Sequence, residues 1–326
     1  MRSIEICAGA GGQALGLEQA GFEHIALIEI DAAACTTLRM NRPSWNVIRG
    51  DVKAFSAKKY EGLVDLLAGG VPCPPFSVAG RQLGHDDERD LFFEAIRLVR
   101  ECKPRAVMLE NVRGLFDSKF DGYREIVKKE LVDLGYECIW ELAQTNHFSL
   151  PQLRPRTVLI ALKKEHMQHF VWPIGLVAPP PTVGQLLFDE MASNGWEGAE
   201  EWARCANGIA PTLVGGSKKH GGADLGPTRA RNAWGKLGVD GRGLADTPPE
   251  KGFTGNPRLT VKMAALLQGF PPDWKIAGKK TPAYRQVGNA FPPPVAKALG
   301  GSIYKALSAV VEEQGVAGYE RARSAV

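Results

Sequence analysis

The sequence predicts an α/β fold: a mostly parallel sheet covered by helices, with a second, smaller and irregular domain. Two observations support this prediction. In the first half of the 326 residues, short apolar runs alternate with helical stretches, which is typical of an open parallel sheet with helices on both faces. From about residue 173 the alternation stops, and prolines and glycines become frequent.

The expected elements follow the chain in order. Strands are expected over residues 4–7, 24–30, 63–67, 106–109, 137–142 and 157–162, the last two as antiparallel partners at a sheet edge. Helices are expected over residues 13–20, 31–40, 89–102, 123–134, 260–268 and 295–311. Gly21 and Gly135 end two of these helices, and Asp31 caps a third. Residues 203–257 show little helical periodicity, and the tail from residue 315 is expected to fray.

Composition and charge narrow the class of protein. The net charge of +4 and the pI near 8.7 permit a polyanionic partner without requiring one. The six cysteines form no C-x-x-C pair, and His166 and His169 have no third ligand nearby, so no metal site is predicted. No apolar run is long enough to span a membrane, and no signal peptide precedes the first strand. We therefore expect a cytoplasmic protein.

A glycine-rich turn follows the first expected strand. Residues 7–12 read Cys-Ala-Gly-Ala-Gly-Gly, and glycines there let the backbone approach a ligand at the N-terminus of the next helix. Glu29 ends the second strand, about 20 residues further on, where an acid can bind ribose hydroxyls. Gly9, Gly11 and Ala14 also satisfy a dinucleotide pattern. A nicotinamide enzyme and a methyltransferase therefore remain equally good interpretations of this segment.

The segment after the third strand separates these two interpretations. Cys73 lies between Pro72 and Pro74, which exclude a helix and stiffen the turn. Most cysteines are inert core residues, but this one follows the carboxyl end of a strand, where the ligands of parallel sheets bind. We therefore predict that Cys73 is a nucleophile rather than a packing residue.

With these residues in view, the chain resembles the bacterial DNA (cytosine-5)-methyltransferases of type II restriction-modification systems over nearly its whole length. Three motifs in order carry the resemblance: Pro72-Cys73, Glu110-Asn111-Val112 and Gln152-x-Arg154-x-Arg156. Residues 7–12, 29–30, 50–52, 87–92, 258–260, 267–271 and 286–290 resemble the family's other motifs. A few positions depart from the pattern, namely Cys7 (usually phenylalanine), Ile30 (often larger), Ser149 (usually glycine), Met263 (commonly glutamate) and Leu266 (commonly arginine).

The resemblance implies a Rossmann-like methyltransferase fold that uses S-adenosylmethionine. It assigns residues 1–172 and 282–326 to a catalytic and cofactor-binding domain, and residues 173–281 to a target-recognition domain and hinge. The residues expected to bind the cofactor are Cys7, Gly9, Gly11, Gly12, Glu29, Ile30, Asp51, Val52, Pro72, Leu91, Asn289 and Ala290.

The implied reaction moves a methyl group to carbon 5 of a cytosine that is flipped out of duplex DNA. A Cys73 thiolate would add to carbon 6, because carbon 5 alone is a poor nucleophile. Glu110 would hydrogen-bond ring nitrogen 3, which requires a proton and therefore a raised pKa. Arg156 would contact the base or the cysteine, and Arg154 would belong to the same catalytic network.

Double-stranded DNA is the partner that the resemblance implies. The residues expected to contact it are Ser77, Arg81 and Gln82 in a candidate closing loop, Thr212 in a Thr-Leu element, and Lys218, Lys219, Arg229 and Arg231 in a basic, glycine-rich stretch. We expect a monomer that protects host DNA, with a cognate restriction endonuclease as a functional rather than a physical partner. Two alternatives remain: a tRNA cytosine-5 methyltransferase of the same fold, and a non-catalytic DNA-binding relative, against which the presence of Cys73 argues.

Overall fold

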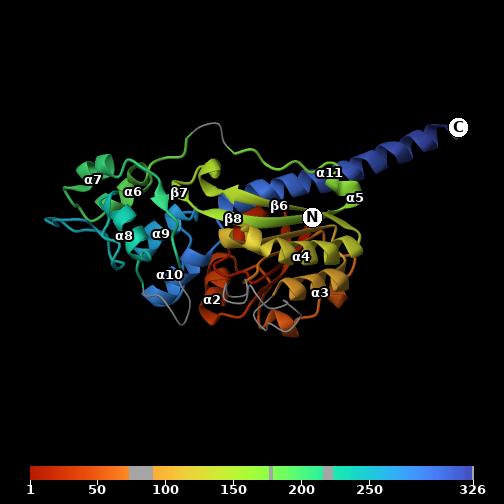
Figure 1. Cartoon of the computed structure of the whole chain (residues 1–326), viewed down its shortest axis with the longest axis horizontal. Helices are drawn as coiled ribbons and strands as arrows, with labels where there is room; N and C mark the ends of the chain where they lie inside the picture. Colours follow the sequence, from red (N-terminus) through yellow and green to blue (C-terminus); the bar gives the residue numbers. More distant parts are fainter. Residues whose placement is uncertain (73–90, 176–178, 216–222, 325–326) are drawn as a thin grey trace.

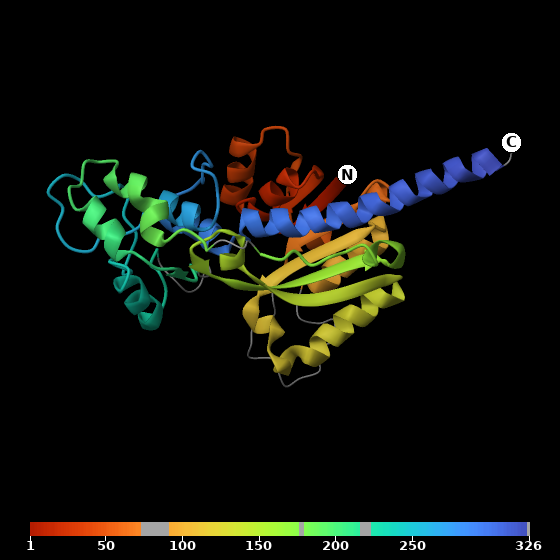
Figure 2. The ribbon, with the colours of Figure 1, turned by 90° about the horizontal axis from the view of Figure 1, so that it is seen from above.

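A computed structural model describes residues 1–72, 91–175, 179–215 and 223–324, with side chains up to residue 310. Figure 1 shows two lobes, a large one built on a sheet and a smaller one that contains α6, α7, α8 and α9. The C-terminal helix α11 runs along the large lobe and projects beyond it (Figure 2).

The large lobe is built on a seven-stranded sheet in the order β3-β2-β1-β4-β5-β8-β6. The strands are β1 (Arg2–Ile6), β2 (Glu23–Glu29), β3 (Val47–Arg49), β4 (Leu66–Gly70), β5 (Ala106–Val112), β6 (Tyr136–Gln144) and β8 (Pro155–Lys163). The first five pair in parallel, and β8 pairs antiparallel with both β5 and β6. The predicted mostly parallel sheet, with an antiparallel pair at its edge, is confirmed.

Helices cover both faces of this sheet. On one face, α3 (Phe92–Cys102) and α4 (Asp121–Asp133) share an apolar cluster with Leu67 of β4. On the other, α1 (Gly12–Gln19) and α11 (Pro293–Ser324) share a second cluster with Leu66. Successive residues of a strand point to opposite faces of the sheet, and helices bury both faces here. The strands are therefore continuous apolar runs in the sequence. This lobe also contains α2 (Ala32–Asn41) and α5 (Lys164–Met167), and α10 (Lys280–Asn289) contacts both α2 and α9.

The smaller lobe is more regular than the sequence predicts. It contains α6 (Val183–Ala192), α7 (Ala199–Cys205), α8 (Thr228–Gly235) and α9 (Val261–Leu267), and a short pair of β7 (Gln152–Leu153) with β9 (Ala210–Pro211). The expectation of little helix after residue 202 is wrong at α8. Trp234 is the one residue of α8 that is buried, so this helix has no apolar stripe for a periodicity argument to detect.

Element boundaries also differ from the prediction, most clearly at the third strand and at the C-terminal helix. The third strand is β4 at Leu66–Gly70 rather than 63–67, since a Cβ at Gly69 would meet Ile6 Cγ1 at 2.5 Å and only glycine permits this approach of β4 to β1. The helix α11 continues to Ser324, beyond the predicted end at residue 311. Strand β3 and the helices α5, α6, α7 and α10 have no counterpart among the expected elements.

Candidate active site

The glycine-rich turn after β1 takes a backbone form that few sequences allow. Cys7, Gly9 and Gly11 have φ values of 53°, 54° and 82°, in the left-handed region that favours glycine. Gly11 is the residue before α1. A Cβ at Gly12 would lie 2.2 Å from the carbonyl oxygen of Phe291, so the turn and the C-terminal segment meet without space for a side chain.

Glu29, at the end of β2, faces this turn. Its Oε2 accepts the backbone N–H of Gly9 at 2.7 Å, and its Oε1 accepts that of Asp31 at 2.7 Å. The side chain is buried. The carboxylate is thereby fixed beside the turn, in the position where an acid can bind the hydroxyls of a ribose.

Two adjoining cavities open at this end of the sheet, with volumes of about 630 and 530 Å³. Cys7, Glu29, Ile30 and Pro72 line both. The first is also lined by Gly9, Gly12, Asn289 and Ala290, and the second by Asp51, Val52 and Leu91. Of the residues predicted to bind a cofactor, Gly11 lines neither cavity; its side of the turn packs on Leu38.

The polar groups in the first cavity fit a ligand with a polar end. Glu5 and Gln13 line it and are almost fully buried. Glu5 Oε2 and both amide atoms of Gln13 have no hydrogen-bond partner in the described part of the chain, which is rare for buried polar groups unless a ligand or water satisfies them. Burial raises the pKa of Glu5 well above its usual value. Ile30, 63% exposed, supplies an apolar surface in both cavities. Such a site suits an adenosyl group that carries an amino acid.

Glu110 stands at the end of β5 and lines the first cavity. Its Oε1 lies 2.8 Å from Nε of Arg156, and both side chains are about nine-tenths buried. The two strands bring this pair together, because Arg156 of β8 is in register with Val112 of β5. Burial raises the pKa of Glu110, and the positive charges of Arg156 and Arg154 oppose the shift without cancelling it. The raised pKa agrees with the acid role expected of this residue.

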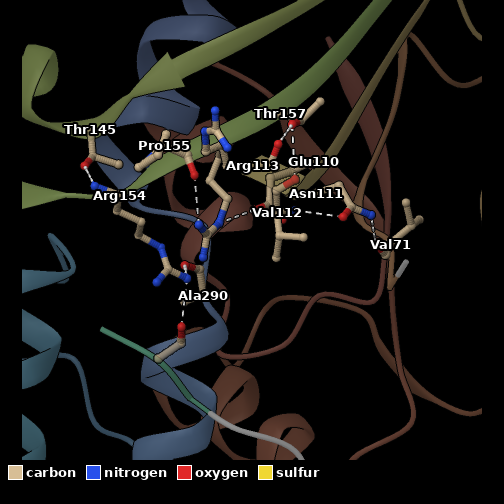
Figure 3. A network of polar contacts seen from close by, with 12 residues as sticks. Val71, Glu110, Asn111, Val112, Arg113, Thr145, Arg154, Pro155, Thr157 and Ala290 are labelled. Atoms are coloured by element: carbon tan, nitrogen blue, oxygen red, sulfur yellow. Dashed lines mark hydrogen bonds and ion pairs between the residues drawn. The ribbon is translucent and has the colours of Figure 1, made fainter. Parts of the chain in front are cut away.

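Asn111 ties the end of β5 to the segment before Cys73. Its Nδ2 donates to the carbonyl of Val71 at 2.8 Å, and its Oδ1 accepts the N–H of Val112 at 2.7 Å (Figure 3). Pro72 follows Val71 and lines both cavities. Cys73 itself lies outside the described residues, and its role remains a prediction.

Arg154 was predicted to belong to the catalytic network, but its guanidinium bonds to backbone carbonyls. It is fully buried, and its guanidinium donates to the carbonyls of Leu213 (2.6 Å), Gly288 (2.7 Å) and Ala290 (3.1 Å). Figure 3 shows the side chain extending to Ala290. Burial and the charge of Arg156 lower its pKa, but an arginine keeps its proton in proteins. These contacts describe a residue that holds backbone segments together.

The predicted DNA contacts are placed only in part. Thr212 donates its hydroxyl to the Leu153 carbonyl at 2.5 Å. Arg229 and Arg231 lie on α8, the first exposed and the second half-buried. The expected contacts Ser77, Arg81, Gln82, Lys218 and Lys219 lie outside the described residues. The sequence analysis named residues 267–271 as a motif but did not predict that the Gln268 amide is buried and bonds to Gln152 and Ala290. A polar glutamine at the end of an apolar helix could have indicated such a buried contact.

Two departures from the family pattern have a structural explanation. Ser149 has φ 62°, a left-handed conformation in which glycine is the usual residue. Met263 occupies the third position of α9, where its sulfur accepts the backbone N–H of Thr260 at 3.4 Å while Thr260 accepts the N–H of Met263. Met263 therefore takes the position that a glutamate holds in an ordinary capping box.

In the part of the chain that the structure describes, no group of three or more His, Cys, Asp or Glu side chains could hold a metal ion. Within the same residues, no helix is both long and apolar enough to cross a membrane.

Comparison with known proteins agrees with this site. The profile of the C-5 cytosine-specific DNA methylase family matches residues 1–305. The type II methyltransferase M.NaeI of Lentzea aerocolonigenes is 57% identical over 311 residues, which cover 94% of this chain and 75% of the relative. The type II methyltransferase M.NgoMIV of Neisseria gonorrhoeae is 56% identical over 307 residues, covering 94% of this chain and 97% of the relative.

Solved structures share the fold. A DNA modification methyltransferase encoded within an E. coli prophage superposes with a TM-score of 0.67 at 23% identity, over 94% of this chain and 99% of the other. The DNMT2 of Spodoptera frugiperda gives 0.65 at 16% identity, over 93% and 99%.

Proposed function

The chain belongs to the C-5 cytosine-specific DNA methylase family and is a DNA (cytosine-5)-methyltransferase that uses S-adenosylmethionine, and we propose that it acts on one cytosine of a specific duplex sequence through a covalent Cys73 adduct. The observation that carries this proposal is the buried Glu110–Arg156 pair. Glu110 lines the same cavity as Pro72, the residue that precedes Cys73.

The cofactor would be held by Glu29 at its ribose, by Ile30 at its adenine and by Asn289 at its amino acid end. It supplies the methyl group that carbon 5 receives. The cavity linings support this assignment, since these three side chains line the same cavity. Glu5 and Gln13 line the same cavity and offer further polar groups.

The chemistry proposed for this chain uses three side chains in turn. The Cys73 thiolate bonds to carbon 6 of the cytosine. Glu110 gives its proton to nitrogen 3, so the ring carries no negative charge and carbon 5 becomes nucleophilic. Arg156 holds the Glu110 carboxyl in place and balances its charge once the proton has left. After carbon 5 has received the methyl group, water takes the proton from carbon 5, the thiolate leaves carbon 6, and nitrogen 3 returns its proton to Glu110.

The target cytosine must leave the duplex before these steps, at a cost of roughly a few kcal/mol. We assign DNA contacts to Thr212, Arg229 and Arg231, together with Ser77, Arg81, Gln82, Lys218 and Lys219. The exposed Arg229 and the half-buried Arg231 on α8 support this assignment because their charge suits phosphate oxygens and base edges. The smaller lobe, within residues 173–281, would read the sequence.

We further propose that the enzyme acts as a monomer in the bacterial cytoplasm, at the nucleoid, and protects host DNA in a restriction-modification system. The type II names of the bacterial relatives M.NaeI and M.NgoMIV support this role. A cognate endonuclease would then recognise the same sequence without binding this chain.

The test is methyl transfer from labelled S-adenosylmethionine to mixed-sequence duplex DNA by the purified protein, with Cys73→Ser beside it. We expect label as 5-methylcytosine with the unmodified protein alone, followed by mapping of the modified site. Label on tRNA and none on DNA would move the activity to RNA. Equal label with Cys73→Ser would refute the covalent mechanism.

A further inference from the structure

A cluster of buried polar side chains joins the two lobes, and the proposed chemistry does not use it. Gln152, Arg154 and Gln268 are each fully buried. The Gln152 amide donates to Gln268 Oε1 at 2.8 Å and accepts the backbone N–H of Leu213 at 3.0 Å. Gln268 donates to the carbonyl of Ala290 at 2.6 Å. These bonds connect β7, the segment after β9, the end of α9 and the end of α10.

Arg154 connects the two segments that matter for function. Its Nη1 donates to Leu213, and its Nη2 donates to Gly288 and Ala290. Leu213 belongs to the Thr-Leu element that leads into the expected DNA-reading stretch. Gly288 and Ala290 flank Asn289, which lines the cofactor cavity. One guanidinium therefore holds the start of the DNA-reading stretch against the wall of the cofactor cavity.

The same two segments touch directly through glycines. A Cβ at Gly288 would lie 2.4 Å from the Cα of Gly215, and a Cβ at Gly215 would lie 2.5 Å from Asn289 Oδ1. No side chain fits between them, so a displacement of residues 213–215 displaces the Asn289 side chain as well. Because of this close contact, Asn289 and the start of the DNA-reading stretch cannot move independently of each other.

We propose that Arg154 is a positioning residue that couples DNA binding to cofactor binding, by holding the Leu213 and Asn289 segments in one arrangement. The proposal rests on the proposed function, which supplies the two ligands. A charged guanidinium that loses one of its buried acceptors leaves a donor unsatisfied, which is costly. The bonds to Leu213, Gly288 and Ala290 are therefore expected to form or break together. By linkage, occupation of either site then favours the other by the same factor.

The first test needs no DNA. Hydrogen–deuterium exchange is measured on the full chain with and without S-adenosylhomocysteine. In the unmodified protein we expect slower exchange at residues 7–12 and 286–290, two segments that contribute to the cavity lining, and also at 210–215. In Arg154→Met we expect the protection at 7–12 to remain and the protection at 210–215 to be lost. A purely structural role would lower protection in both regions, with and without the ligand.

The second test measures the affinity for S-adenosylhomocysteine by calorimetry, alone and with a duplex that carries the mapped target. Couplings between sites are typically about 5- to 150-fold, and we expect a tightening within this range for the unmodified protein. Arg154→Met should abolish the tightening, and Arg154→Lys, which keeps the charge and one donor group, should restore part of it.

Arg124→Met is the matched control. The Arg124 guanidinium also donates to backbone carbonyls, those of Leu115 and Asp117, but inside the large lobe. This variant should keep both the spread of protection and the tightening. If Arg154→Met does not fold, Gly288→Ala separates the same segments by adding a methyl group at their contact, and the same losses are expected.

Unchanged protection at 210–215 in a folded Arg154→Met or Gly288→Ala would overturn the proposal. Failure of the proposed function has a different signature. The exchange pattern would appear as expected, but no label would reach DNA, so the coupling of the two segments would stand while the DNA substrate would not.

Discussion

At the scale of single residues, Glu110 is expected to make the rate of the reaction depend on pH. Its pKa is raised by burial, against the charges of Arg156 and Arg154. The protonated form is the one that serves nitrogen 3, so the rate of methyl transfer should fall as pH rises through the raised pKa. Glu110→Gln cannot give up a proton, and its rate should be about 10²- to 10⁴-fold lower, without that fall. Single-turnover rates across a pH series check both expectations. An unmodified protein with no falling limb would contradict the acid role.

The same carboxyl should affect folding stability with a definite sign. Because its folded pKa is raised, the folded state holds this proton more tightly than the unfolded state, whose pKa is about 4.3. The contribution to stability is present below that value and is lost as pH rises through the folded pKa. Urea unfolding of the unmodified protein and of Glu110→Gln should therefore show a difference that changes with pH in this direction. A constant difference would mean that Glu110 has an ordinary pKa.

Cofactor affinity is predicted to depend on Glu29. Its two carboxylate oxygens are fixed by the N–H groups of Gly9 and Asp31. Glu29→Gln replaces one acceptor by a donor that faces an N–H group, which both disturbs the turn and removes the charged acceptor for a ribose hydroxyl. Loss of one charge-assisted hydrogen bond costs about 1.5–3 kcal/mol. Calorimetry with S-adenosylhomocysteine should show an affinity at least about 10-fold lower. An unchanged affinity would remove Glu29 from the site.

At the scale of elements, the contact between α1 and α11 depends on glycine. A Cβ at Gly16 would meet the Pro293 carbonyl oxygen at 2.4 Å and the Ala296 Cβ at 2.5 Å. This crossing positions the start of α1, and with it the glycine-rich turn of the cofactor site. Gly16→Ala should lower the unfolding free energy by about 1–3 kcal/mol through overpacking, although alanine is the better helix former.

Gly301→Ala is the control for this prediction. Gly301 lies in α11 as well, and a Cβ there meets no atom within 4 Å. The same substitution should therefore raise stability, by about 0.5–1 kcal/mol. Chemical unfolding of both variants checks the opposite signs. Equal effects would show that helix propensity rather than the α1–α11 contact governs both positions.

At the scale of the whole molecule, DNA binding should depend on salt through Arg229 and Arg231 of α8 in the smaller lobe. Each phosphate contact contributes about −0.9 to the slope of log K against log salt. If Arg229 and Arg231 each contact a phosphate, replacing both by glutamine should weaken binding and reduce the slope by about 1.8. Arg100→Gln, on α3 and paired with Glu130, should leave the slope unchanged. Fluorescence anisotropy at several salt concentrations checks this. A slope that stays the same in the double variant would place the DNA elsewhere.

The sequence by itself determined the large lobe and the chemistry of its strand ends. Short strands buried on both faces and helices that carry an apolar stripe are local patterns, and β1, β2, β5, α3 and α4 follow from them. The side chains at strand ends, Glu29 and Glu110 among them, lie at one cavity because parallel strands bring their carboxyl ends to one edge of the sheet.

Only the tertiary structure decided the role of residues whose partners are distant in sequence. No local pattern distinguishes Arg154 from Arg156, yet one reaches Gly288 and the other Glu110. The helix α8 was hidden for a related reason: with Trp234 as its one buried residue, its position depends on packing rather than on its own periodicity. Contacts between distant segments depend on how the whole chain closes, and that information is not contained in any single stretch of it.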